Sequence, residues 1–461
     1  MYNIIYQLFS RCFTKDLPRF LKDAKKIGFL GFGKSNRAVF EFLKERLRFD
    51  AVVREERSVP RDLPEGCRLL SGDAALNFDG EDIIFVSPSV RRERREVARL
   101  LGSVGRVSSD AELFFALTDK PVLAVSGSDG KSTTVKMAEA ILGGEGALAC
   151  GNVGLPFVKA LGAAEKRLVT ELSSFTLEYT VPPSRRAVIT NITENHLDWH
   201  GSFEAYTAAK ENLLKHTDEA ILSPDTEACV PLIFKYKPWG IFSSRESFSE
   251  LRRKYPFSDS FFTLEGELLS KNGEALISVS KLSKKEPHNI QNALAAIALT
   301  CGLFNTGRGI EALSSFSGLS HRMEAVAFIS GVSYVDSSID STPKRTSATL
   351  LSMPRAVTVL LGGRGKGLSY EPLAKPLLAK TGDIIIFGEN RGEIYEALAK
   401  YSLLRRRIAL AETLAEAVKI AKERARAGDT VLLSPASTSY DAFSDFEERG
   451  NKFKEYINSE G

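Results

Sequence analysis

Short apolar segments rich in β-branched residues alternate along this chain with longer segments whose apolar residues recur at helical spacing. The apolar segments predict buried strands at residues 25–31, 49–55, 82–87, 121–126, 167–171, 186–191, 331–336, 356–362, 383–388 and 430–435. The longer segments predict helices at 38–44, 133–142, 203–215, 293–299 and 413–422. Regular alternation of strands and helices is typical of α/β units with largely parallel sheets, so we expect an α/β fold.

The length of the chain and the positions of its polar segments indicate how it divides into domains. A chain of 461 residues predicts about three domains. We place these at residues 1–110, 111–318 and 319–461, because the polar segment Gly318–Glu324 separates two patterned regions and is expected to be a hinge. Residues 231–285 mix short strands with basic turns and contain no recognisable motif.

Composition narrows the classes of protein to which the chain can belong. Hydrophobic residues make up 43% and charged residues 26%, as in folded soluble proteins, and no apolar run is long enough to predict a membrane span. The first ten residues are apolar but lack a basic leader, so we expect a cytoplasmic protein. Five scattered cysteines without a C-x-x-C pair indicate neither a disulfide framework nor a cysteine zinc site. A net charge of +4 with interspersed signs indicates no nucleic-acid partner.

The segment Val125–Thr133, with the sequence VSGSDGKST, carries the clearest chemical signal in the chain. It follows a predicted strand and opens a predicted helix, as a loop that binds the phosphates of a nucleoside triphosphate does. Backbone N–H groups, a lysine and a hydroxyl that binds Mg²⁺ are the expected contacts. The residues that would make them are Gly127, Ser128, Asp129, Gly130, Lys131, Ser132 and Thr133. Val125 stands where the full pattern has a glycine, so the loop is shortened; the alternative is a glycine-rich turn that only packs.

The first domain contains half of a dinucleotide-binding fingerprint. Gly31 and Gly33 follow the first predicted strand, but Asn36 occupies the position of the third glycine. A turn that binds a nucleotide diphosphate and a tight turn without a ligand both fit this pattern. Ser87 begins a second polar loop at the end of another predicted strand, where open α/β sheets bind ligands.

Several polar residues of the second domain also lie where a phosphate site could use them. Glu171 ends a predicted strand and is a candidate Mg²⁺ ligand, although a surface acid is the commoner interpretation. His196 belongs to an H-x-D-x-H segment after the next strand, which favours a metal and phosphate site over an isolated zinc site. Taken alone, Lys210 is best interpreted as an exposed helix lysine. Asn289 and Asn292 present two amides that could bind a base edge.

A set of motifs in this chain resembles the Mur ligases in order and spacing, over essentially the whole length. The motifs are Gly127–Thr133, Glu171–Phe175, Asn195–Asp198, His288 to Asn292, His321–Met323, Leu433–Ala436 and Phe446–Gly450. Among the family, they are most similar to the motifs of the D-glutamate-adding ligases. The resemblance implies three domains: an N-terminal Rossmann-like unit that holds UDP, a central P-loop-type ATPase with a mixed or parallel sheet, and a C-terminal Rossmann-like unit.

The resemblance also implies a reaction. The carboxylate of UDP-N-acetylmuramoyl-L-alanine would take the γ-phosphoryl group of ATP, with Mg²⁺ as cofactor, to give an acyl phosphate. The amine of D-glutamate would then attack the acyl carbon and release phosphate. Phosphoryl transfer mainly needs positioned cations that neutralise developing charge, which suits the residues found. We expect a monomer with these two substrates as its partners.

The resemblance assigns roles to individual residues. Lys131 would hold the β- and γ-phosphates, and Arg322 would contact the triphosphate across the domain junction. The implied metal ligands are Ser132 or Thr133, Glu171, His196 and a carbamylated Lys210. Adenine would contact Asn289 and Asn292, and Asp336 is expected at the ATP site. The substrate contacts would be Ser35, Glu56, Arg57 and Ser87 for the nucleotide part, Asn152 and Ser173 for the muramoyl-alanine part, and Lys366, Ser439, Tyr440 and Phe446 for D-glutamate.

The chain departs from the family pattern mainly between Asp336 and Pro343. Ile339 stands where many members have lysine, and counting from His321 places Ser337 at the usual aspartate position, so Asp336 and Ser337 are both candidates for the ATP site. Three alternatives to the ligase are a folylpolyglutamate-synthase-like ligase, an ATPase switch without ligase activity, and an NAD-dependent oxidoreductase that rests only on the incomplete fingerprint.

Overall fold

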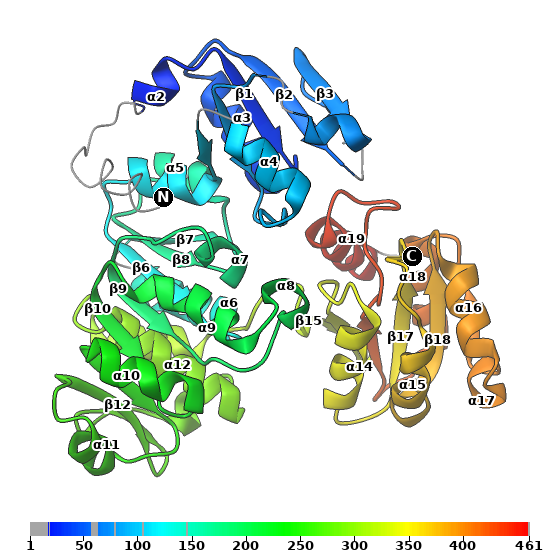
Figure 1. The fold of residues 1–461 in the computed structure, drawn as a ribbon. Helices are drawn as coiled ribbons and strands as arrows, with labels where there is room; N and C mark the ends of the chain where they lie inside the picture. Colours follow the sequence, from blue (N-terminus) through cyan, green and yellow to red (C-terminus); the bar gives the residue numbers. More distant parts are fainter. Residues whose placement is uncertain are drawn as a thin grey trace. The chain divides into compact units, whose positions relative to one another are not determined.

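The computed structural model describes residues 17, 19–56, 63–77, 80–103, 106–143 and 146–459 (Figure 1). Contacts between residues divide the chain into two compact units, Met1–Phe316 and Ser317–Gly461. The described residues form three sheets, in which parallel pairs of strands predominate. This arrangement confirms the predicted α/β class. The predicted domain boundaries at residues 110 and 318 stay predictions.

The first sheet belongs to the N-terminal part of the first unit and is parallel throughout. Its strands are β1 (Lys26–Leu30), β2 (Asp50–Glu55), β3 (Cys67–Ser71), β4 (Ile83–Val86) and β5 (Val107–Ser108), in the order β3-β2-β1-β4-β5. The helices here are α2 (Arg19–Lys22), α3 (Lys34–Lys44), α4 (Arg95–Ser103) and α5 (Asp110–Leu117). Successive strand residues face opposite sides, so Phe29 packs with α3 and α5 whereas Leu30 packs with α4.

The second sheet is the largest and carries the predicted phosphate loop. Its strands are β6 (Val122–Ser126), β7 (Ala147–Gly151), β8 (Arg167–Glu171), β9 (Ser184–Ile189), β10 (Thr217–Leu222), β11 (Gly240–Ser243), β12 (Ser260–Glu265), β13 (Leu268–Lys271) and β14 (Glu274–Ser278). The order is β14-β13-β12-β11-β10-β9-β6-β8-β7. The strands β6 to β12 pair in parallel, and β12, β13 and β14 form an antiparallel meander that lies within the segment without a recognisable motif.

Helices cover both faces of this sheet (Figure 1). On one face, α6 (Lys131–Leu142), α12 (Pro287–Thr300) and α13 (Thr306–Ser314) pack against Leu123 and Val125 of β6. On the other, α9 (Phe203–Glu211), α10 (Val230–Tyr236) and α11 (Phe248–Lys254) share a core with Ala124. The short helices α7 (Ser174–Leu177) and α8 (Leu197–His200) follow β8 and β9. Because β6 is buried on both faces, its sequence is a continuous apolar run rather than an alternating one.

The third sheet forms the second unit. Its strands are β15 (Glu324–Ile329), β16 (Val332–Asp336), β17 (Val357–Gly362), β18 (Thr381–Phe387), β19 (Ile408–Leu410) and β20 (Thr430–Leu433), in the order β15-β16-β20-β17-β18-β19. Only β15 pairs in antiparallel fashion. The helices are α14 (Pro343–Ser352), α15 (Ala374–Lys380), α16 (Arg391–Ala399), α17 (Ser402–Arg405), α18 (Leu414–Arg424) and α19 (Phe446–Asn458). The first four pack on one face of the sheet, and α18 and α19 pack on the other.

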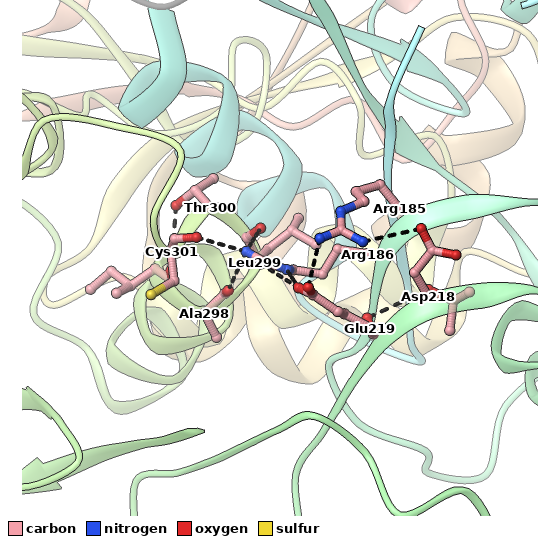
Figure 2. A network of polar contacts seen from close by, with 10 residues as sticks. Arg185, Arg186, Asp218, Glu219, Ala298, Leu299, Thr300 and Cys301 are labelled. Atoms are coloured by element: carbon pink, nitrogen blue, oxygen red, sulfur yellow. Dashed lines mark hydrogen bonds and ion pairs between the residues drawn. The ribbon is translucent and has the colours of Figure 1, made fainter. Parts of the chain in front are cut away.

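Two buried arginines link elements in the first unit. Arg54 of β2 is fully buried, and its Nη2 atom lies 2.6 Å from Glu81 Oε1. Arg186 of β9 donates from Nε to Glu219 Oε2 over 2.6 Å, and from Nη1 to the carbonyl oxygens of Leu299 and Cys301 over 3.0 and 2.9 Å (Figure 2). These carbonyls end α12, so Arg186 supplies partners that the last turn of a helix otherwise lacks.

Within the part of the chain that the structure describes, no helix combines the length and the apolarity that crossing a bilayer requires.

Candidate active site

The phosphate loop connects β6 to α6 through two glycines in conformations that other residues rarely adopt. Gly127 and Gly130 have φ angles of +149° and +79°. A Cβ atom on Gly127 would lie 1.9 Å from Thr190 Oγ1, and one on Gly130 would lie 2.1 Å from Asn292 Oδ1. Only glycine fits either position without displacing a neighbour. Gly130 also caps α6, whose N-terminal N–H groups can therefore face an anion.

The loop is held by the segment that follows β9. The N–H of Asp129 donates to Asn191 Oδ1 over 2.9 Å, and Thr190 Oγ1 donates to the Asp129 carbonyl over 2.6 Å. Ser128 is buried and bonds through Oγ to the hydroxyl of Tyr206 and the N–H of Thr193, each at 2.9 Å. Since β6 and β9 are parallel neighbours in the sheet, the loops that follow them meet at the carboxyl ends of these strands. We did not predict roles for Thr190 and Asn191, although their place at a strand end was a usable signal.

Two lysines converge on one carbonyl of the loop. Lys131 Nζ donates to the carbonyl oxygens of Gly127 and Ser128 over 2.9 and 2.8 Å. Lys210 Nζ donates to the same Gly127 oxygen over 2.6 Å, and Lys210 is only 1% exposed. The interpretation of Lys210 as a surface lysine is therefore wrong. Burial, followed by the positive charge of Lys131, lowers the pKa of Lys210 well below its usual 10.5.

Glu171 lies beside the loop with one oxygen unpaired. It ends β8, pairs in register with Val125 of β6, and is 1% exposed. Its Oε1 atom accepts a hydrogen bond from Asn152 Nδ2 over 2.9 Å, whereas its Oε2 atom is buried and has no hydrogen-bond partner among the described residues. Leaving a buried carboxylate oxygen unpaired is costly, and a divalent cation would satisfy it. The donor chemistry at this strand end therefore fits a Mg²⁺ ion.

His196 lies on an exposed loop supported by an aromatic cluster. It has a φ of +53° at the N-terminus of α8, and its ring centroid lies 4.8 Å from that of Phe175. The ring of His200 stacks on the same phenyl group at 5.9 Å, and its Nε2 lies 3.1 Å from Ser174 Oγ. Burial, with the neighbouring His196, lowers the pKa of His200. The cluster supports the loop, on which His196 is exposed and His200 is partly buried.

Asn292 and Asn289 begin α12, and their surroundings differ. Asn292 is buried against Gly130 of the phosphate loop, and its Oδ1 lies 3.5 Å from Thr134 Oγ1. Asn289 is partly exposed and donates from Nδ2 to Glu286 Oε2 over 2.8 Å. Of the two predicted base-contacting residues, Asn292 therefore lies next to the phosphate loop and restricts the residue at position 130.

The incomplete fingerprint of the first sheet is completed by Asn36 rather than by a third glycine. Asn36 Nδ2 donates to the carbonyl oxygens of Leu30, Gly31 and Phe85 over 3.2, 2.8 and 3.0 Å, which ties the ends of β1 and β4 together. A Cβ atom on Gly31, whose φ is +77°, would lie 2.9 Å from Ser87 Cβ. Asn36 thus has a structural role that sequence alone did not reveal.

The other candidate residues of this sheet lie at the same edge. Ser35 hydrogen-bonds the buried carboxyl group of Asp110, whose pKa is raised by burial. Ser87 Oγ lies 2.9 Å from Ser89 Oγ, and Glu56 pairs with Arg94 at 2.5 Å. Arg57 lies outside the described residues. In the central sheet, Ser173 caps α7 by accepting from the N–H of Thr176 over 3.2 Å.

The second unit contains the residues predicted for D-glutamate. Lys366 is exposed, and its Nζ lies 3.5 Å from Ser341 Oγ. Partial desolvation, followed by the positive charge of Arg345, lowers the pKa of Lys366. Ser439 is buried, Tyr440 is exposed, and Phe446 begins α19. Of the two candidate residues near the predicted hinge, Arg322 is exposed and Asp336 is fully buried.

Comparison with known proteins agrees with this arrangement. Residues 125–300 match the Mur ligase middle domain, and residues 321–437 match the domain described as Mur ligase, glutamate ligase domain. The UDP-N-acetylmuramoylalanine–D-glutamate ligase of Ruminiclostridium cellulolyticum is 32% identical over 96% of this chain and 99% of its own length. The ligase of the same name from Clostridium kluyveri is 33% identical over 96% and 98%.

Solved structures of similar fold include two peptide ligases. The UDP-N-acetylmuramate–alanine ligase of Thermotoga maritima aligns with a TM-score of 0.59 at 19% identity, over 94% of this chain and 99% of that one. The murein peptide ligase of Psychrobacter arcticus aligns with a TM-score of 0.51 at 16% identity, over 95% and 100%. The domain matches, together with relatives at least 32% identical over nearly the full length, show that the chain belongs to the Mur ligase family.

Proposed function

We propose that this chain is an ATP-dependent ligase that joins D-glutamate to UDP-N-acetylmuramoyl-L-alanine in peptidoglycan precursor synthesis. The relatives that carry this activity in their names match nearly the whole chain. The structural observation that carries the proposal is the convergence of Lys131 and Lys210 on the Gly127 carbonyl, next to the unpaired Oε2 atom of Glu171. A lysine that can pair with phosphate, a second, buried lysine and a carboxylate oxygen without a hydrogen-bond partner, together at a phosphate loop, suit phosphoryl transfer to a carboxylate.

The residues of the nucleotide site divide into phosphate, base and metal contacts. Lys131 and Arg322 bind the triphosphate, and the N–H groups from Gly127 to Gly130 surround it. Asn289 and Asn292 contact adenine. Glu171, His196 and the Ser132 or Thr133 hydroxyl hold Mg²⁺, which, when bound, neutralises negative charge on the phosphates. These assignments follow the matched family motifs and the fit of Glu171 to a cation.

Lys210 contributes to the metal site after modification. Its amine nitrogen attacks carbon dioxide, a C–N bond forms, and the nitrogen loses a proton, which gives a carbamate with a carboxylate-like end. Only a neutral amine can make this attack. The low pKa of Lys210 supports the proposal, because the buried amine is neutral at a lower pH than a surface lysine.

The reaction itself proceeds in two displacements. A carboxylate oxygen of the muramoyl-alanine substrate attacks the γ-phosphorus of ATP, and the bond to the β-phosphate oxygen breaks to release ADP. The D-glutamate amine then attacks the acyl carbon, loses a proton, and expels phosphate from the tetrahedral intermediate. Lys131 balances charge on the phosphate oxygens during the first displacement.

The remaining candidates position the substrates. Ser35, Glu56, Arg57 and Ser87 contact the nucleotide, Asn152 and Ser173 contact the muramoyl-alanine part, and Lys366, Ser439, Tyr440 and Phe446 bind D-glutamate. A lysine and a hydroxyl suit the side-chain carboxylate of D-glutamate. We propose that the enzyme acts in the cytoplasm as a monomer, with domains at residues 1–110, 111–318 and 319–461.

The test is release of phosphate from ATP and Mg²⁺ in the presence of UDP-N-acetylmuramoyl-L-alanine. D-glutamate is compared with L-glutamate, with D- and L-lysine, and with no amino acid. Phosphate release that requires both UDP-N-acetylmuramoyl-L-alanine and D-glutamate supports the proposal. Release that needs neither would leave an ATPase switch, and release with a folate acceptor instead would favour a folylpolyglutamate-synthase-like ligase.

Replacing Lys131 separates the ATP site from the acceptor site. Lys131→Ala is expected to abolish turnover while the affinity for UDP-N-acetylmuramoyl-L-alanine, measured by calorimetry, stays nearly unchanged. Lys136→Ala is the matched control, since Lys136 lies on the same helix and pairs with Glu139 at the surface. Equal loss of turnover and acceptor affinity in Lys131→Ala would contradict the assignment of the loop.

A further inference from the structure

The backbone on both sides of Arg322 adopts a conformation that non-glycine residues rarely use. His321 and Met323 have φ angles of +64° and +51°, both in the left-handed region. Arg322, which lies between them, is exposed. Two residues of this kind on either side of an exposed arginine need neighbouring groups that hold them in place.

The His321 side chain is held by Asp336. His321 Nδ1 lies 2.7 Å from Asp336 Oδ2, and the two side chains are 8% and 0% exposed. The other carboxylate oxygen, Oδ1, accepts the N–H of Ser338 over 2.7 Å. Both oxygens of Asp336 are therefore engaged within the second unit. A buried, charge-assisted bond of this length fixes the imidazole, and with it the backbone that carries Arg322.

Gly450 of α19 leaves space for this pair. A Cβ atom at residue 450 would lie 2.1 Å from His321 Nδ1 and 2.4 Å from Asp336 Oδ2. The contact therefore tolerates no side chain at this position. The ring of Phe446, one turn earlier on the same helix, packs edge-on against the imidazole with centroids 6.1 Å apart.

Hydrogen bonds from both neighbours of Arg322, one of them supported by an ion pair, also hold the main chain here. The His321 N–H donates to Glu324 Oε2 over 2.7 Å, and Lys454 of α19 pairs with Glu324 at 2.8 Å. The Met323 N–H donates to Ser337 Oγ over 3.3 Å. The adjacent residues Asp336 and Ser337 thus contact opposite sides of Arg322, one through the His321 side chain and the other through the Met323 backbone.

We propose that Asp336 acts through His321 as a positioning residue for Arg322, rather than by touching ATP. This inference rests on the proposed function, in which Arg322 contacts the triphosphate. It also gives separate roles to the two candidates for the ATP site, since Ser337 supports the same segment from the other side. The side chain of Arg322 is exposed, and the network fixes the direction in which it leaves the backbone.

The same side chains could also be considered as a metal site, because ligand atoms of His321, Glu324 and Asp336 lie within 4.8 Å of one another. Two observations favour the hydrogen-bonded network. The 2.7 Å separation of His321 Nδ1 and Asp336 Oδ2 is that of a direct hydrogen bond, and the Lys454 ammonium group already neutralises Glu324.

The test compares Asp336→Ala with Asp340→Asn. Asp340 is a matched control, because it is also buried but bonds to Thr349 and Ser434 instead of His321. Asp336→Ala is expected to raise KM for ATP and to lower kcat, so that kcat/KM for ATP falls by about ten- to a hundredfold. The KM for UDP-N-acetylmuramoyl-L-alanine is expected to stay unchanged. Asp340→Asn is expected to change neither. Equal effects of the two variants on kcat/KM for ATP would overturn the proposal.

A double-mutant cycle separates positioning from direct contact. If Asp336 acts through Arg322, then Asp336→Ala has no further effect on kcat/KM for ATP in an Arg322→Ala background. Independent, multiplying effects would overturn the proposal. Gly450→Ala attacks the same pair from α19 and is expected to reproduce the ATP effect. Its control, Gly392→Ala, places a methyl group in open space on α16 and is expected to be silent.

Two measurements distinguish this inference from the proposed function. If the unaltered enzyme releases no phosphate that depends on D-glutamate, the proposed function fails. The role of Asp336 is then decided by the affinity for a fluorescent ATP analogue. Asp336→Ala and Arg322→Ala should each weaken this affinity, and the double variant should weaken it no further than Arg322→Ala alone. An unchanged affinity in Asp336→Ala would overturn the inference. A stoichiometric transition metal that the unaltered protein holds and Asp336→Ala loses would also overturn it, in favour of a metal site.

Discussion

Replacing Arg186 with methionine should destabilise the first unit by about 3 kcal/mol, a value that follows from its contacts. The two short bonds to carbonyls at the end of α12 each come from a charged donor, and such bonds contribute roughly 1.5–3 kcal/mol. Methionine keeps an unbranched aliphatic side chain but lacks the guanidinium, whose Cζ lies 4.3 Å from the centroid of the Trp239 ring. Glu219 also keeps Arg185 as a partner at 2.9 Å, so the loss is at the lower end of about 3–5 kcal/mol for breaking a buried pair.

Arg185 provides the control for this prediction. Its side chain is 52% exposed, against 7% for Arg186, so Arg185→Met should cost at most about 1 kcal/mol. Urea unfolding followed by tryptophan fluorescence measures both variants, since Trp199 and Trp239 both lie in the first unit. Hydrogen exchange in the last turn of α12 should accelerate only in Arg186→Met. Equal losses of stability in the two variants would refute the capping argument.

Three other perturbations test separate parts of the structure. Gly130→Ala should lower kcat/KM for ATP at least about tenfold in the phosphate-release assay, because its methyl group would meet Asn292 and residue 130 has a φ of +79°. Gly143→Ala places its methyl group in open space and should leave kcat/KM for ATP unchanged. Arg54→Met should cost about 3–5 kcal/mol in urea unfolding by removing the buried ion-pair partner of Glu81. The double variant Arg54→Met with Glu81→Leu should cost less, and a larger cost for the double variant would contradict this. Because folding lowers the pKa of Lys210, the unfolded chain binds more protons than the folded chain below the usual value of 10.5. The free energy of unfolding of the unaltered protein should therefore rise with pH toward that value. Lys210→Met should lack this rise when the two proteins are compared at about pH 7.5 and 9.5 without carbon dioxide.

The strands that carry the site could be predicted from sequence because their burial leaves a local pattern. β6 is apolar up to Ser126, β1 is apolar from Ile27 to Leu30, and β8 contains the apolar pair Leu168 and Val169. All three strands lie within a residue of the predicted positions. Helix starts were less accurate. α6 begins at Lys131 rather than 133, and α12 begins at Pro287 rather than 293. The first turn of α6 is polar and that of α12 is mixed, so neither shows the apolar spacing from which the helices were predicted.

Burial that depends on distant residues could not be predicted. Lys210 has the sequence context of a surface lysine, and its burial follows from contact with Gly127, which is 83 positions away. Asn36 interrupts a glycine pattern, and its role depends on carbonyls from both β1 and β4. The strands β12 to β14 gave no clear periodic signal, because their apolar residues are divided between exposed and buried positions.

The close approach of Gly130 to Asn292 has a consequence for how the family can diverge. A shorter side chain at residue 292 would remove the steric conflict at residue 130. A substitution of Gly130 that is excluded while Asn292 is present could therefore be tolerated after residue 292 has changed. The left-handed backbone at 130 would still cost a side chain about 1–2 kcal/mol, whatever stands at 292. Evolution at this pair is therefore expected to be ordered, with changes on the helix preceding changes in the loop, and the two positions should covary among homologous sequences.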